Sequence, residues 1–167
     1  MREPFVYPVS PVPRTAVLVD WFRSAVLSSQ SIRMFPQGWG AEAAQFEPAA
    51  IAATIEQLRT LCGVPIPSLT HAVIVLERPG TPRLTEANRT LFWHNFRVPL
   101  FEQIIGPSGL LLAAECQAHE GLHIEAQGLQ IAQDGIHTKP CPCGRETPRF
   151  GVRSVAEIER RAAAYAR

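Results

Sequence analysis

The sequence predicts an α/β fold, in which a partial parallel sheet with flanking helices is followed by a β-hairpin and a cysteine-rich loop. The run HAVIVLE at residues 71–77 is rich in β-branched residues, as is typical of a strand buried on both faces. Residues 84–96 have helical spacing with Thr85 as a cap, and residues 98–105 again have the composition of a strand.

The N-terminal part of the chain is predicted to contain an arm, a helix and a short strand. Four prolines favour an extended, polyproline-like arm over residues 1–14. Residues 15–29 place apolar side chains at three- and four-residue steps, which predicts an amphipathic helix. The short apolar run in residues 31–39 is cut by Pro36 and Gly38, so we expect a strand or irregular segment that ends in a turn.

Helical spacing returns before the buried strand. Apolar residues between positions 47 and 63 keep this spacing, Pro48 suits a first helical turn, and Gly63 ends the pattern. Helix, strand, helix and strand therefore alternate up to residue 105, and this order favours a piece of parallel α/β sheet.

The C-terminal part is predicted to pair its strands locally. Residues 110–116 and 121–127 have strand composition and are joined by the short segment QAHE, so we expect a hairpin or an adjacent pair. Residues 138–148 are dense in proline, cysteine and glycine, which predicts a loop, and residues 155–165 are expected to form a closing helix.

Length and composition indicate one α/β domain over residues 15–167. The chain has 167 residues, of which 46% are hydrophobic and 19% charged, the balance of a globular protein. Its net charge of +1 comes from 16 basic and 15 acidic residues mixed along the sequence, which favours neither nucleic acid nor an anionic membrane as a partner. No apolar run resembles a signal peptide or a membrane span, so the expected location is the cytoplasm.

Three of the four cysteines and three of the five histidines fall between Glu115 and Arg145. Thiolate and imidazole are the ligands that zinc prefers, and in a reducing compartment clustered cysteines indicate metal or catalysis more often than disulfides. We therefore expect a zinc-binding subregion at 115–150. The candidate ligands are Cys116, His119 and His123 on one side, and His137, Cys141 and Cys143 on the other.

Spacing favours a Cys3His set made of Cys116, His123, Cys141 and Cys143. A short turn can bring the end of one hairpin strand and the middle of the next together, and a curled CPCG loop supplies two more thiolates. His119 is the alternative histidine, because Cys116-x-x-His119 is also a common ligand spacing. His123 is favoured because it lies between two apolar residues, where a partly buried imidazole needs a partner.

The number of ligands decides what such a metal would do. Four protein ligands leave no open position for water, so the zinc is expected to be structural. With only three ligands, Glu115 or Glu120 would act as a general base beside a zinc-bound water. The competing interpretation without metal is that the cysteines are buried thiols and the histidines are surface groups.

The segments AAEC at 113–116, GLHI at 121–124 and CPCGR at 141–145 occur in this order after VPLFEQII. Over roughly residues 50–150, this succession resembles the adenylate-forming ligases of the phenylacetate-coenzyme A ligase type. The resemblance implies part of an acyl-CoA ligase fold and zinc bound by the four residues that spacing also selects, namely Cys116, His123, Cys141 and Cys143.

The resemblance does not extend to the catalytic parts of these ligases. Gly109 stands where the family has its catalytic glutamate, and neither the phosphate loop nor the lid lysine has a counterpart here. We therefore expect a non-catalytic zinc-binding accessory or interaction protein, a pseudoenzyme with a protein partner or a second copy of itself. The alternatives are an acyl- or aryl-CoA ligase subunit completed by a partner chain, and a small zinc-dependent hydrolase.

Overall fold

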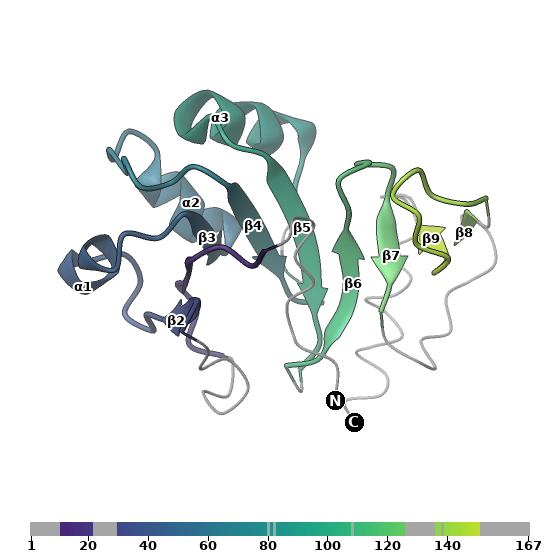
Figure 1. The fold of residues 1–167 in the computed structure, drawn as a ribbon, viewed down its shortest axis with the longest axis horizontal. Helices are drawn as coiled ribbons and strands as arrows, with labels where there is room; N and C mark the ends of the chain where they lie inside the picture. Colours follow the sequence, from purple (N-terminus) through teal and green to yellow (C-terminus); the bar gives the residue numbers. More distant parts are fainter. Residues whose placement is uncertain are drawn as a thin grey trace.

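The computed structural model describes residues 11–21, 30–79, 81, 83–107, 109–125, 136–137 and 139–150. Within these residues one mixed sheet of nine strands runs in the order β2-β1-β3-β4-β5-β6-β7-β9-β8 (Figure 1). The first five strands in this order, up to β5, pair in parallel, and the remaining strands pair antiparallel. The α/β class and the change from parallel to local pairing agree with the prediction.

The parallel half holds all the helices of the described residues. Its strands are β1 (Thr15–Val17), β2 (Ile32–Met34), β3 (Ala50–Ala53), β4 (Ala72–Glu77) and β5 (Leu100–Ile105). Its helices are α1 (Ala41–Gln45), α2 (Ile55–Leu61) and α3 (Glu86–Phe96). The antiparallel half consists of β6 (Leu111–Glu115), β7 (Leu122–Ile124), β8 (Ile136–His137) and β9 (Arg149–Phe150).

The prediction of a helix over residues 15–29 is wrong for its first three residues. Thr15–Val17 form β1, which lies between β2 and β3 and is buried along its whole length. In an interior strand both faces are apolar, and such a run cannot be distinguished from a buried helix by periodicity alone. Residues 22–29 lie outside the described residues.

The helix predicted over residues 47–63 is right only in its second half. Ala50–Ala53 form β3 between two other parallel strands, and the helix α2 begins at Ile55. Thr54 determines this start, because its side chain accepts a hydrogen bond from the Gln57 amide while the Gln57 side chain bonds back to the Thr54 amide. The short helix α1 was not predicted.

The central elements are confirmed. β4 is buried along its whole length, α3 is capped by Thr85, and β5 pairs in parallel with β4. β6 and β7 form the expected antiparallel hairpin. Residues 1–10 of the arm predicted over 1–14, and the helix predicted over 155–165, lie outside the described residues.

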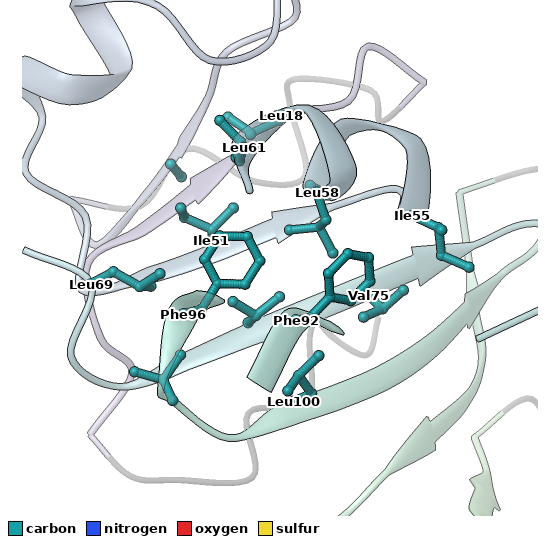
Figure 2. Packing of buried hydrophobic residues seen from close by; sticks show 14 of the residues in the cluster. Leu18, Ile51, Ile55, Leu58, Leu61, Leu69, Val75, Phe92, Phe96 and Leu100 are labelled. Carbon is teal, nitrogen blue, oxygen red and sulfur yellow. The ribbon is translucent and has the colours of Figure 1, made fainter. Parts of the chain in front are cut away.

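A hydrophobic core lies on the sheet face that α2 and α3 cover. In Figure 2 the rings of Phe92 and Phe96 lie over Ile51 and Val75 of the sheet, and Phe92 is fully buried. This cluster contains 17 buried residues among those described, whereas the cluster of the antiparallel half contains five. The antiparallel half therefore has much less apolar packing of its own.

No helix in the described ranges is both long and apolar enough to cross a membrane.

Candidate metal centre

The β6–β7 hairpin positions the first half of the site. Its turn is closed by the His119 amide, which donates to the Cys116 carbonyl at 3.0 Å. Gly121 has φ +92°, and a Cβ atom there would lie 2.8 Å from the Phe150 carbonyl oxygen. Only glycine allows this turn to sit against β9.

The loop before β9 positions the second half. The Gly144 amide donates to the Cys141 carbonyl at 2.9 Å, and Gly144 has φ +81°, so the CPCG segment curls into a tight turn. β9 pairs with β7, with Arg149 opposite His123. The loop is therefore attached to the hairpin by backbone hydrogen bonds as well as by its cysteines.

Four side chains meet between these two segments: Cys116, His123, Cys141 and Cys143. Their candidate ligand atoms all lie within 4.8 Å of one another. The Sγ atoms of Cys116 and Cys141 are 3.6 Å apart, and the Sγ atom of Cys143 is 3.4 Å from Nε2 of His123. A tetrahedral zinc with Zn–S bonds of about 2.3 Å places its sulfur ligands about 3.8 Å apart and sulfur and nitrogen about 3.6 Å apart. The spacing of the four atoms fits a tetrahedral metal ion.

His123 is held in the orientation that such a site requires. Its side chain is fully buried, and its Nδ1 atom lies 2.9 Å from Oγ1 and 3.1 Å from the carbonyl oxygen of Thr147. A ring nitrogen that bonds to a carbonyl carries the proton, which leaves the lone pair on Nε2 beside the cysteines.

The protonation of the site without metal follows from burial and from the neighbouring groups. Burial raises the pKa of the Cys116 thiol to about 12, with further increases from Cys143 and Cys141. Burial also raises the pKa of Cys141, but hydrogen bonds from Cys143 and Cys116 together with the Arg149 charge outweigh it and leave that pKa below its ordinary value. Burial and the Arg145 charge lower the pKa of His123. Metal binding here would therefore displace thiol protons while finding the imidazole already neutral.

The arginines beside the loop are paired. Arg145 forms an ion pair with Glu125, and Arg149 donates to the Glu120 carboxylate at 2.9 Å. These contacts tie the cysteine loop to the hairpin, so neither guanidinium is an open anion site.

His119, the alternative ligand, lies outside the cluster. Its Nδ1 atom is 3.0 Å from the Glu115 carboxylate, and its ring stacks on Phe101 with centroids 5.1 Å apart. His137 is exposed in β8, and Cys62 is half-buried at the end of α2. Among the histidines of the subregion, the structure brings only His123 to the cysteines.

Sequence reasoning missed a row of buried carboxylates on the face that α3 covers. Glu102 forms ion pairs with Arg83 and Arg89. Glu115 accepts hydrogen bonds from Arg89 at 3.0 Å and from the Glu102 amide at 2.9 Å. Single glutamates inside the apolar runs LFEQII and LLAAE were the available signal, since a buried carboxylate needs partners.

Glu77 completes this row at the end of β4. Its carboxylate accepts from the Leu84 amide at 2.6 Å and lies 2.7 Å from Nε of Arg83. Burial, followed by the charge of Glu102, raises the pKa of Glu77 to about 8. Glu77 is therefore mostly protonated at neutral pH.

Comparison with known proteins adds a likeness at the level of the fold. No protein-family model matches the sequence, and a search of curated proteins gives no match. Solved structures of 2-hydroxyisobutyryl-CoA ligase do match. The open conformation, in complex with 2-HIB-AMP and CoA, has a TM-score of 0.60 at 14% identity and covers 85% of this chain. The thioesterification state has a TM-score of 0.53 at the same identity and coverage of this chain.

The chain has the fold of part of an acyl-CoA ligase. It spans 44% and 43% of the length of these two ligase chains, less than half in each case. The likeness supports the partial acyl-CoA ligase fold predicted from the sequence, and it does not distinguish the phenylacetate type from other ligases.

Proposed function

We propose that this chain is a non-catalytic, zinc-binding accessory or interaction protein built on part of an acyl-CoA ligase fold. The observation that carries the proposal is the meeting of three thiols and one imidazole within 4.8 Å, in a region with little apolar core. Thiolate and imidazole donors favour zinc over magnesium or calcium, which prefer oxygen ligands.

The proposed zinc is structural. Four protein ligands complete a tetrahedral site and leave no position for a catalytic water, so this arrangement does not favour the hydrolase alternative. Glu115 and Glu120, the candidate general bases, already bond to Arg89 and Arg149. Binding of structural zinc contributes on the order of 10 kcal/mol to folding, enough to hold strands of two and three residues together. Reduced thiolate ligands also favour a cytoplasmic location.

A partner chain or a second copy is part of the proposal. β2 has only three residues and is the first strand in the sheet order of the described residues. Exposed backbone at a sheet edge favours pairing with another chain. The chain also spans less than half of the length of the ligases that share its fold.

The likeness to a ligase bound to 2-HIB-AMP and CoA favours a second candidate, a ligase subunit completed by another chain. The order of AAEC, GLHI and CPCGR points to the phenylacetate type within that class. The accessory function is preferred because Gly109 lies in the β5–β6 turn. The resemblance to the phenylacetate-type ligases places the catalytic glutamate of that family at this position.

Native mass spectrometry with elemental analysis tests the proposal. Stoichiometric zinc, together with a co-purified protein or a homodimer, is the expected result. A thermal-shift series with ATP and magnesium, coenzyme A or phenylacetate separates the two candidates, because a specific ligand raises Tm by mass action. A clear rise in Tm with any of these ligands would favour the ligase subunit over the accessory protein. A metal-free chain that folds normally would contradict the proposed zinc site.

A further inference from the structure

A cleft of about 720 Å³ lies beside the metal cluster and is distinct from it. One wall is a single face of α3, formed by Glu86, Arg89, Thr90 and Trp93, which recur at three- and four-residue steps. The opposite wall comes from the hairpin and β9, and includes His119, Leu122 and Phe150. The volume is within the range of small-molecule sites.

The cleft lies at the end of the sheet opposite to the usual ligand site of this fold class. Pro99 and Leu100, at the start of β5, line it together with Glu115, at the end of the antiparallel strand β6. It therefore opens at the amino ends of the parallel strands, where α3 meets β5 and the β6–β7 turn (Figure 1). Open α/β sheets bind their ligands at the carboxyl ends. A ligand in this cleft would occupy a separate site.

Hydrogen-bond acceptors dominate the polar atoms of the cleft. Three carboxylates line it, those of Glu86, Glu102 and Glu115, against the single guanidinium of Arg89. Arg83 pairs with Glu102 from outside the cleft and also lies 2.7 Å from the Glu77 carboxylate. Among the described residues Glu86 makes no ion pair, which leaves its carboxylate available at the rim.

His119 adds a ring in a fixed position. Its Nδ1 atom lies 3.0 Å from the Glu115 carboxylate. Stacking on Phe101 and a backbone φ of +53°, unusual for a residue with a side chain, fix the position of this ring. Strained residues of this kind recur at binding sites.

The cleft has an exposed aromatic side chain on its α3 wall. Trp93 is 47% exposed, and it lines the cleft together with Leu122 and Phe150. An indole face attracts a cation through its quadrupole more strongly than the other aromatic rings do. A flat apolar body with a positive charge satisfies both the aromatic wall and the excess of acceptors.

From these contacts we infer that the cleft binds a small organic cation, an ammonium group on a flat apolar body. The ammonium donates to Glu86, and the body lies between Trp93 and the hairpin wall. This site is separate from the proposed structural zinc, and it depends neither on the identity of that metal nor on a protein partner.

The test is an NMR titration in which benzylammonium is added to the full chain. The chain is used as purified, with any metal that it carries. Benzyl alcohol and benzoate serve as ring-matched neutral and anionic controls. Benzylammonium is expected to cause saturable shifts of the Trp93 indole and the Gly121 amide, with at least about five-fold higher affinity than either control, since a partly desolvated cation–π contact of about 1 kcal/mol corresponds to that ratio.

Variants locate the site. Trp93→Ala and Glu86→Gln are each expected to weaken benzylammonium binding about three- to five-fold. Leu91→Ala is the matched control, because Leu91 is an exposed residue of the same helix outside the cleft. Dispersed spectra show that each variant is folded. Equal binding of benzoate, absence of saturation, or full affinity in Trp93→Ala would overturn the inference. Binding of a lysine-rich peptide but not of benzylammonium would also overturn it, in favour of a polypeptide ligand.

Discussion

The Nε2 atom of His123 lies 3.4 Å from the Sγ atom of Cys143. This contact joins the hairpin to the CPCG loop and distinguishes His123 from His119, whose ring bonds to Glu115. It also gives the most direct test of the proposed ligand set.

His123→Ala is expected to abolish stoichiometric metal binding, because the loss of one of four ligands opens a closed tetrahedral site. Metal content after dialysis against a weak chelator, measured by elemental analysis, checks this outcome. His119→Ala is the matched control and should retain its metal, since its side chain lies outside the cluster. The reverse pattern would assign the ligand to His119.

Thr147→Val is expected to weaken zinc binding while all four ligands remain. The Oγ1 atom of Thr147 lies 2.9 Å from Nδ1 of His123, and loss of such a supporting contact costs about 10- to 100-fold in affinity. The backbone carbonyl of Thr147 remains at 3.1 Å, so a value near about 10-fold is expected. Competition with a chromophoric chelator measures this change, with Thr60→Val in α2 as a distant control. Unchanged affinity would show that the carbonyl alone orients the ring.

Removal of the metal is expected to loosen the antiparallel half and to spare the parallel half. The cluster of the antiparallel half contains five buried residues against 17 in the cluster beneath α2 and α3. Hydrogen exchange of the metal-loaded and chelated protein should show lost protection in β7 and β9, with little change in β3 and β4. Equal loss of protection in both halves would mean that the metal controls global folding.

Glu77 should make the protein less stable as the pH rises from about 5 to 8. Its pKa in the folded protein is raised to about 8 from an ordinary 4.5, so in this interval the folded state holds a proton that the unfolded state has released. The free energy of unfolding therefore falls with pH. Glu77→Gln should remove this contribution, and the variant should gain stability relative to the wild type most clearly at pH 8.

Denaturant unfolding at several pH values measures this difference. Glu56→Gln, an exposed carboxylate on α2, should leave the pH profile unchanged. If the free energy of unfolding changes equally with pH in the wild type and in Glu77→Gln between pH 5 and 8, the assignment of the proton to Glu77 is contradicted.

Gly121→Ala is expected to destabilise the protein more than Gly63→Ala. Both glycines have positive φ, +92° and +85°, so alanine costs about 1 kcal/mol at either position from the backbone alone. At Gly121 the added Cβ would also lie 2.8 Å from the Phe150 carbonyl oxygen, whereas nothing lies within 4 Å at Gly63. Thermal unfolding of the two variants compares these costs, and equal losses would show that β9 shifts freely away from the turn.

Secondary structure was predicted correctly where the residue pattern of a segment distinguishes a strand from a helix. HAVIVLE, the Thr85-capped helix and the β6–β7 hairpin are confirmed. A high content of β-branched residues marks the first as a strand, a cap with helical spacing marks the second, and a short connecting segment marks the third. β1 and β3 were misjudged because both are interior strands with two apolar faces, and periodicity does not separate such a run from a helix.

The candidate site was predictable in part for a similar reason. The four Cys and His residues meet because two short segments, the hairpin and the CPCG loop, carry them, and local spacing determines which side chains can converge. The carboxylate row of Glu77, Glu102 and Glu115 was not foreseen, since it depends on the register of β4, β5 and β6 with one another. The cleft beside α3 depends on the same register.

β5 pairs in parallel with β4 along one edge and antiparallel with β6 along the other. An antiparallel neighbour needs only a short turn, whereas each parallel neighbour requires a long crossover whose closure costs more entropy. Hairpins form in about 1–10 μs, well before such crossovers close. During refolding, the segment from β5 to β7 can therefore pair first, and β5 then offers its free edge to the slower parallel strands.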